Sequence, residues 1–71
     1  MLRAVTAWVR RGSSRDITVL YYLRDRLIAA DCVNRPRDFL AVKRALGEGR
    51  TIPAGPAADA STALKELITA P

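Results

Sequence analysis

The sequence has 71 residues, of which 49% are hydrophobic, and a formal net charge of +5. A chain of this length forms at most one domain, whose core alone gives marginal stability. One cysteine and no histidine exclude an internal disulfide and a zinc site. The longest uncharged apolar stretch, Ile17–Leu23, is too short to span a bilayer, which takes about 20 residues.

The first fifteen residues form a basic block with four arginines and no carboxylate. Within it, Leu2, Val5 and Trp8 fall on one face of a helix. We therefore expect an amphipathic helix over 2–11 that ends at Gly12, because glycine is the common residue just beyond a helix. The basic patch of this block consists of Arg3, Arg10, Arg11 and Arg15.

The same block has the composition of an organellar targeting segment, which is rich in arginine, contains serine and lacks acidic residues. Segment 1–12 is therefore expected to be targeting-like, whether or not it is retained. This predicts a mitochondrial protein, in the matrix or at the matrix face of the inner membrane. The alternative is a bacterial or phage cytoplasmic protein whose first helix is merely basic.

Residues 13–50 are expected to form a helical hairpin. Ser13 followed by Asp16 has the spacing of a capping box, and a helix over 14–32 would be apolar around more than half its circumference. Such a helix packs against more than one partner. A further helix is predicted over 36–46, antiparallel to the first because the connection is short. Their contact should involve Leu20, Leu23, Leu27, Phe39, Val42 and Leu46.

The C-terminal part is expected to be a proline- and glycine-containing linker over 51–60, followed by a short helix within 61–71. Within the linker, the sequence TIPAGPAA carries two prolines and one glycine, which is typical of extended segments. Ser61 can cap a helix that runs to about Thr69. The predicted fold class is all-α: an antiparallel helix pair with an N-terminal amphipathic helix and a short C-terminal helix.

No catalytic constellation is visible in the sequence. The four aspartates between residues 16 and 38 lie among arginines and are expected to form solvated ion pairs. The sequence GEGR at 47–50 follows the predicted helix instead of preceding it, so it is not a phosphate-binding loop. We therefore predict no catalytic residue, no cofactor, no metal and no enzymatic activity.

One charged residue lies in the middle of the apolar arc of the second predicted helix. Arg24 is flanked there by Leu20 and Ile28, four residues away on either side. Its head group either reaches water past the apolar surface or pairs with a carboxylate of a partner, because a buried arginine must be paired. We expect a partner interface made of Trp8, Leu20, Tyr22 and Arg24.

These observations predict a small non-catalytic accessory subunit of a multiprotein assembly, in a mitochondrial respiratory-chain or ATP synthase complex. Its partners would be other protein subunits, with RNA or phospholipid contact through the N-terminal arginines as a further expectation and with no transmembrane span. The alternative is a basic nucleic-acid-binding protein, either mitoribosomal or a small helix-turn-helix DNA binder.

Two short motifs resemble mitochondrial families. The sequence WVRRGSS at 8–14 is similar to the start of the ATP synthase epsilon subunit, and RDRL at 24–27 is similar to a later motif of that family. Leu20-Tyr21-Tyr22 with Phe39 resembles the Leu-Tyr-Arg family of small three-helix subunits and assembly factors, with a tyrosine in place of the arginine. Both resemblances imply a helical subunit. Both motifs are short, and we assign the chain to neither family.

Overall fold

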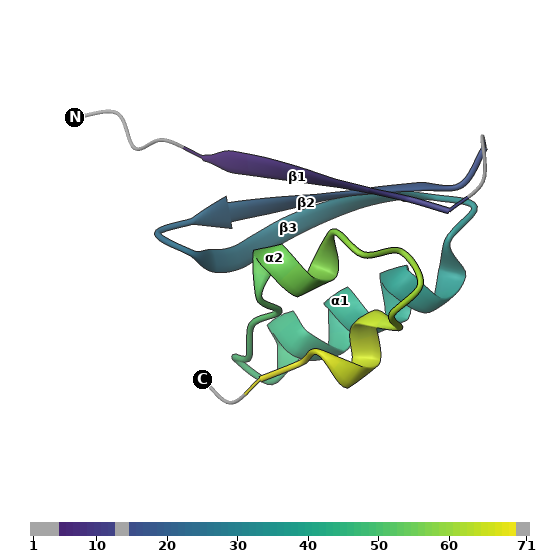
Figure 1. Ribbon diagram of the computed structural model, residues 1–71. Coiled ribbons are helices and arrows are strands. Elements are labelled where there is room, and N and C mark those ends of the chain that lie inside the picture. Colours follow the sequence, from purple (N-terminus) through teal and green to yellow (C-terminus); the bar gives the residue numbers. More distant parts are fainter. Residues whose placement is uncertain (1–4, 13–14, 70–71) are drawn as a thin grey trace.

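A three-stranded antiparallel sheet forms the first half of the molecule (Figure 1). The computed structural model describes residues 5–12 and 15–69. The strands are β1 (Thr6–Arg11), β2 (Ile17–Leu23) and β3 (Arg26–Val33), and they lie in the order β1-β2-β3. The predicted all-α class is therefore wrong, and the fold is mixed α/β.

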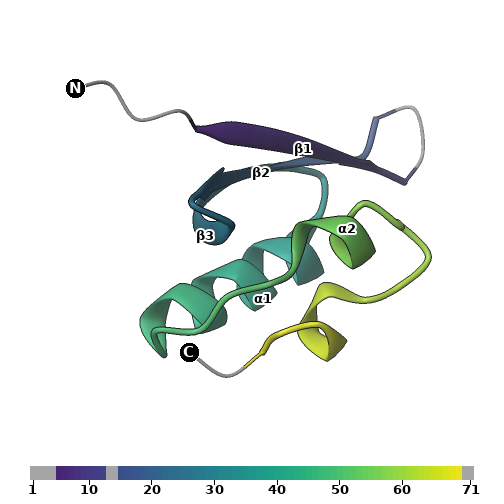
Figure 2. The same ribbon diagram turned by 60° about the vertical axis from the view of Figure 1, so that its left-hand side comes forward.

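The second half of the chain covers one face of this sheet. The main helix α1 (Pro36–Gly47) is followed by the single turn α2 (Ala54–Ala57) and the 3-10 helix η1 (Leu64–Glu66). Figures 1 and 2 show all three on the same side of the sheet, with α1 along β3. No helix of the described part of the chain is long and apolar enough to cross a membrane.

β2 forms a strand because its residues favour extended backbone. Its sequence ITVLYYL combines β-branched and aromatic side chains. Its even-numbered residues are buried and its odd-numbered ones half-buried, which is the period of a strand. Arg24 and Asp25 then make a two-residue hairpin turn with positive φ angles of 54° and 63°.

Four of the predicted elements can be compared with the structure. The helix expected over 2–11 is wrong, because Thr6–Arg11 is a strand. The helix expected over 14–32 is also wrong, since this stretch contains β2, the turn and all of β3 except its last residue. The helix over 36–46 is confirmed by α1. In the last segment only three residues are helical, as the 3-10 turn η1.

The expected linker over 51–60 carries more structure than predicted. It contains the helical turn α2, and Thr51 forms an isolated antiparallel bridge with Thr69. This bridge brings the C-terminal segment back beside the residues that follow α1. The expectation that Thr51–Ala58 lacks regular structure is therefore wrong.

The core lies between the sheet and the helical layer. It consists of Leu20, Tyr22, Leu27, Ala41, Val42, Ala45, Ile52, Ala57 and Leu64. Of the residues expected in a helix–helix contact, Leu20, Leu27 and Val42 belong to this core. Phe39 and Leu46 instead have exposed fractions of 55% and 41%.

Candidate functional site

A buried carboxylate joins the sheet to the start of α1. Asp38 is only 3% exposed, and its Oδ2 accepts hydrogen bonds from Arg10 Nε (3.0 Å), Thr18 Oγ1 (2.8 Å) and Arg35 Nε (3.0 Å). Burial raises the pKa of Asp38, but these donors lower it by more, so the net pKa lies below its ordinary value. Asp38 is therefore ionised at neutral pH, and the expectation of a solvated ion pair is wrong.

Arg10 extends this network to the C-terminal segment. Its side chain comes from β1 and is 1% exposed, and Nη1 donates to the carbonyls of Ala57 (3.1 Å) and Asp59 (2.7 Å) while Nη2 donates to that of Thr62. The planar guanidinium presents its donors in a fixed fork. One side chain thus holds a strand, a helix and an irregular segment together.

The guanidinium of Arg35 lies against Gly12. A Cβ atom at residue 12 would collide with Nη1 of Arg35, so the glycine leaves the space that the guanidinium occupies. Arg35 lies just before α1 and bonds to Asp38 three residues later. The end of β1 and the start of α1 are therefore fitted to each other at this point.

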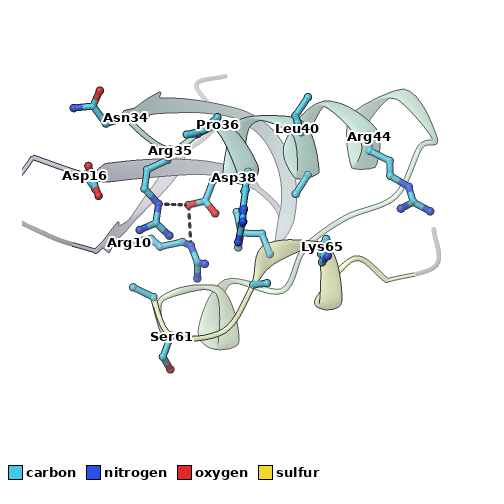
Figure 3. A pocket seen from close by; sticks show the side chains of 15 residues that line it. Arg10, Asp16, Asn34, Arg35, Pro36, Asp38, Leu40, Arg44, Ser61 and Lys65 are labelled. Carbon is cyan, nitrogen blue, oxygen red and sulfur yellow. Dashed lines mark hydrogen bonds and ion pairs between the residues drawn. The ribbon is translucent and has the colours of Figure 1, made fainter.

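An open groove of about 870 Å³ lies next to the Asp38 network. It runs between the N-terminal three-quarters of α1 and the segment 60–65, with Arg10, Arg35 and Asp38 at one end (Figure 3). Five cationic and two acidic side chains line it, giving a local net charge of +3. We call this the basic groove. Its cationic residues are Arg10, Arg35, Arg37, Arg44 and Lys65.

Some cations of the basic groove are free to meet a ligand. Arg10 and Arg35 are committed to Asp38, and Arg44 pairs with Glu48 on the exposed helix surface at 3.1 Å. Arg37 and Lys65 have no ion-pair partner among residues 5–12 and 15–69. The exposed Leu40 and the buried Leu64 add apolar side chains to the lining of the groove.

The structure disperses the residues of the predicted basic patch. Arg10 is buried in the Asp38 network, so it belongs to the interior of the fold. Arg11 and Arg15 are exposed. Arg3 lies outside the described residues.

The residues of the predicted partner interface are also separated. Leu20 and Tyr22 are buried at 0% and 2% exposure, and the Tyr22 hydroxyl donates to the Ile52 carbonyl at 2.7 Å. These two side chains are core residues of the domain instead of surface residues. Trp8 is 40% exposed on the edge strand β1, and Arg24 is exposed in the hairpin turn.

Of the network residues, sequence reasoning named Arg10 as part of a basic patch and missed Thr18, Arg35 and Asp38 as site residues. Asp38 had one available signal, because it lies in the first turn of a predicted helix, two residues after a proline and three residues after Arg35. Nothing in the sequence pairs it with Arg10, which is 28 residues away. Thr18 lies on the buried face of strand β2. A helix over this stretch does not predict that face, so it does not predict the contact of Thr18 with Asp38.

Comparison with known proteins gives a family and a relative. Residues 2–68 match the family model described as "Reductase C-terminal". Over 58 residues the chain is 34% identical to the 5,5'-dehydrodivanillate O-demethylase ferredoxin reductase subunit of Sphingobium sp. (strain NBRC 103272 / SYK-6). The matched stretch covers 82% of this chain and 14% of that relative. No solved structure matches.

These findings correct the predicted function. A chain that matches a reductase family is not a non-catalytic accessory subunit of a respiratory or ATP synthase complex, and the nucleic-acid-binding alternative is wrong for the same reason. The prediction of no enzymatic role is also wrong, since the family is one of reductase domains. The predicted mitochondrial localisation stays a prediction.

The family match extends over nearly the whole chain, and the relative lies above 30% identity with four-fifths of the chain aligned. The chain spans about one-seventh of the length of that relative. It belongs to the reductase C-terminal family.

Proposed function

We propose that this chain is the C-terminal domain of an FAD-dependent ferredoxin reductase that serves a multicomponent oxygenase or demethylase. The observation that carries the proposal is the family match over 2–68, together with a relative named as a ferredoxin reductase subunit. In this role the domain contributes a binding surface to an enzyme whose redox groups lie elsewhere.

The chemistry of the chain fits a domain without its own redox centre. An iron–sulfur cluster takes four cysteine ligands, and the sequence has one cysteine. FAD is commonly held on a parallel βαβ unit with a glycine-rich turn before a helix, whereas the described residues form an antiparallel sheet, and Gly47 and Gly49 lie at the C-terminal end of α1. The described residues do not form such a site, so the flavin belongs to the rest of the reductase.

The basic groove is the surface of this domain that suits a protein electron acceptor. A local charge of +3 attracts a partner whose docking surface carries carboxylates, and such steering raises the association rate. The unpaired cations Arg37 and Lys65 can make new ion pairs without breaking existing ones. We therefore assign the ferredoxin contact of this domain to the basic groove.

The test uses the natural reductase with Arg37→Glu, measured as ferredoxin reduction against ferredoxin concentration. We expect KM for ferredoxin to rise about tenfold with kcat nearly unchanged, because charge reversal at a partly desolvated contact costs about 1.4 kcal/mol or more of binding. The difference from the unmodified enzyme should shrink as ionic strength rises.

Lys43→Glu is the matched control. Lys43 lies on the same helix, carries the same charge and is exposed, but it does not line the groove. Its KM should therefore stay close to that of the unmodified enzyme. If both variants raise KM equally, the effect is one of overall charge and the groove is not the contact.

A further inference from the structure

The two walls of the basic groove differ in how they are supported. One wall is α1, a regular helix packed on the core. The other wall is the segment 60–65, whose only helical part is the start of η1. Among the described residues, the backbone hydrogen bonds donated by 57–67 reach carbonyls only three or four residues earlier. Such local bonds shape this wall, but they do not attach it to the rest of the fold.

Arg10 links the two walls directly. Its Nε donates to Asp38 in the first turn of α1 at 3.0 Å, while Nη1 and Nη2 donate to the three carbonyls of the 57–62 segment. Figure 3 shows the Arg10 side chain between Asp38 and the segment that carries Ser61. Within the described chain, no other hydrogen bond joins residues 57–63 to a distant part of the protein. Because the guanidinium is rigid and planar, it fixes both the distance and the orientation of the walls.

The unpaired cations of the groove lie beside the two ends of this link. Arg37 directly precedes Asp38 on α1, and Lys65 follows Thr62 by three residues on the other wall. The side chains of Arg10 and Asp38 are only 2% and 4% exposed, so they offer almost no surface to a docked protein. The pair therefore acts on a partner through the placement of Arg37 and Lys65.

We propose that Arg10 and Asp38 are positioning residues for the ferredoxin, an inference that rests on the proposed function. Their bond sets the spacing at which Arg37 and Lys65 meet the carboxylates of the ferredoxin. Attraction between charges falls with distance, so a partner whose carboxylates have a fixed spacing binds best to cations held at the matching spacing. Walls that are already fixed also avoid the cost of ordering them on binding.

A role of the pair through charge alone makes a different prediction. Asp38→Asn raises the local net charge of the groove from +3 to +4, because one of its two carboxylates is lost, and Arg10→Met lowers that charge to +2. If only charge mattered, Asp38→Asn would lower the KM for an acidic ferredoxin and Arg10→Met would raise it. Both substitutions weaken the same link, since a neutral amide oxygen accepts a weaker hydrogen bond than a carboxylate. Positioning therefore predicts that both raise KM.

The test measures ferredoxin reduction by the natural reductase with Asp38→Asn or Arg10→Met, against ferredoxin concentration. We expect each variant to raise KM about fivefold with kcat nearly unchanged. Amide hydrogen exchange of residues 58–63 should become faster in both, while slow exchange in α1 shows that the domain is folded. If Arg10→Met does not fold, Arg10→Lys replaces it. Lysine keeps the groove at +3 but is a point donor without the fork, so the same rise in KM is expected.

Leu27→Ala is the matched control for lost stability. Leu27 is a core residue with 2% exposure and does not line the groove. Truncating a buried leucine destabilises a domain about as much as removing one member of a buried ion pair. Because the link and the groove charge are unchanged, we expect KM close to that of the unmodified enzyme.

Three results would overturn the inference. The first is a lower KM in Asp38→Asn, which would show that the pair acts through charge. The second is an equal rise in Leu27→Ala, which would show that lost stability alone weakens binding. The third is an unchanged KM in Asp38→Asn and in the Arg10 variant while Arg37→Glu raises KM, which would leave the proposed function standing. An unchanged KM in Arg37→Glu would instead refute the ferredoxin contact, and the exchange of 58–63, measured without ferredoxin, would still report whether the pair links the walls.

Discussion

Arg10 shows how one side chain can hold an irregular structure in place. It is buried, it is charged, and its Nε, Nη1 and Nη2 donate to Asp38 and to three backbone carbonyls. Removing a single partner of a buried ion pair costs more than the pair contributes, because it leaves the other charge uncompensated. The carbonyls of the 57–62 segment would lose their donors as well.

We expect Arg10→Met to lower the free energy of unfolding by about 3 kcal/mol. Asp38 keeps Thr18 and Arg35, which limits the loss. The measurement is the urea unfolding midpoint, and the control is Arg11→Met, the exposed neighbour on the same strand, with an expected change within about 0.5 kcal/mol. Equal losses in both variants would show that Arg10 acts only as a surface charge.

The Tyr22 hydroxyl makes stability sensitive to alkaline pH. Burial raises the pKa of Tyr22 from 10.0 to about 12, so the folded state holds the phenolic proton more tightly than the unfolded state. The contribution is complete below pH 10 and is lost as the pH rises from 10 towards 12. Tyr22→Phe should remove this loss.

The measurement is Tm between pH 8 and 12. At pH 8 the phenylalanine variant should be less stable by about 1 kcal/mol, because the Ile52 carbonyl loses its donor. Above pH 10 the two curves should converge. Parallel curves over the whole range would show that Tyr22 does not titrate with unfolding.

Replacing either of the two glycines at the end of α1 by alanine should change the stability of the fold, in opposite directions. Gly47 is the last residue of the helix and a Cβ there would touch nothing within 4 Å, whereas Gly49 has a φ of +68°. Gly47→Ala should stabilise the fold by about 0.5–1 kcal/mol. Gly49→Ala should destabilise it by about 1 kcal/mol, since L residues avoid positive φ. The measurement is the Tm of each variant. A change of Tm in the same direction in both variants would contradict the prediction.

The elements differ in how far the sequence predicts them. The helix at 36–46 could be found because Pro36 suits a first turn and the apolar residues recur at helical spacing. The apolar pattern of 14–32 predicts a helix because a segment that is apolar on two opposite faces also fills a wide arc on a helical wheel. The hairpin turn is made by Arg24 and Asp25 without glycine or asparagine, so no turn signal interrupted the pattern.

At the scale of the molecule, the sequence predicts that the chain has a partner, but it does not predict which surface the partner would contact. Trp8 and Arg24 lie on the surface, whereas Leu20 and Tyr22 lie in the core. The apolar residues that alternate with Leu20 and Tyr22 along β2, such as Val19, face the other side of the sheet. The basic groove needs contact between α1 and the 60–65 segment, which no local pattern specifies.

The two faces of β2 should respond differently to the same substitution in the 71-residue chain. Leu20→Thr places a hydroxyl in the core and removes buried methyl groups, so we expect a loss of about 3 kcal/mol, enough to unfold a domain of this size. Val19→Thr on the other face of the sheet should cost less than about 1 kcal/mol and reduce self-association. Circular dichroism and light scattering measure both. If Val19→Thr destabilises the chain as much as Leu20→Thr does, then Val19 is packed against other residues of the same chain and its face of the sheet is not free.

The bonds of Arg10 also set the order in which the domain can form during synthesis. Its acceptors lie up to 52 residues further along the chain, so the guanidinium has no complete set of partners until residue 62 has left the ribosome. Before that moment a charged side chain would have to enter the forming interior unsatisfied. The sheet and α1 can therefore assemble loosely as they emerge, but the native fold closes only after release of the C-terminal segment, and translation that stops short of it yields a chain that cannot complete folding.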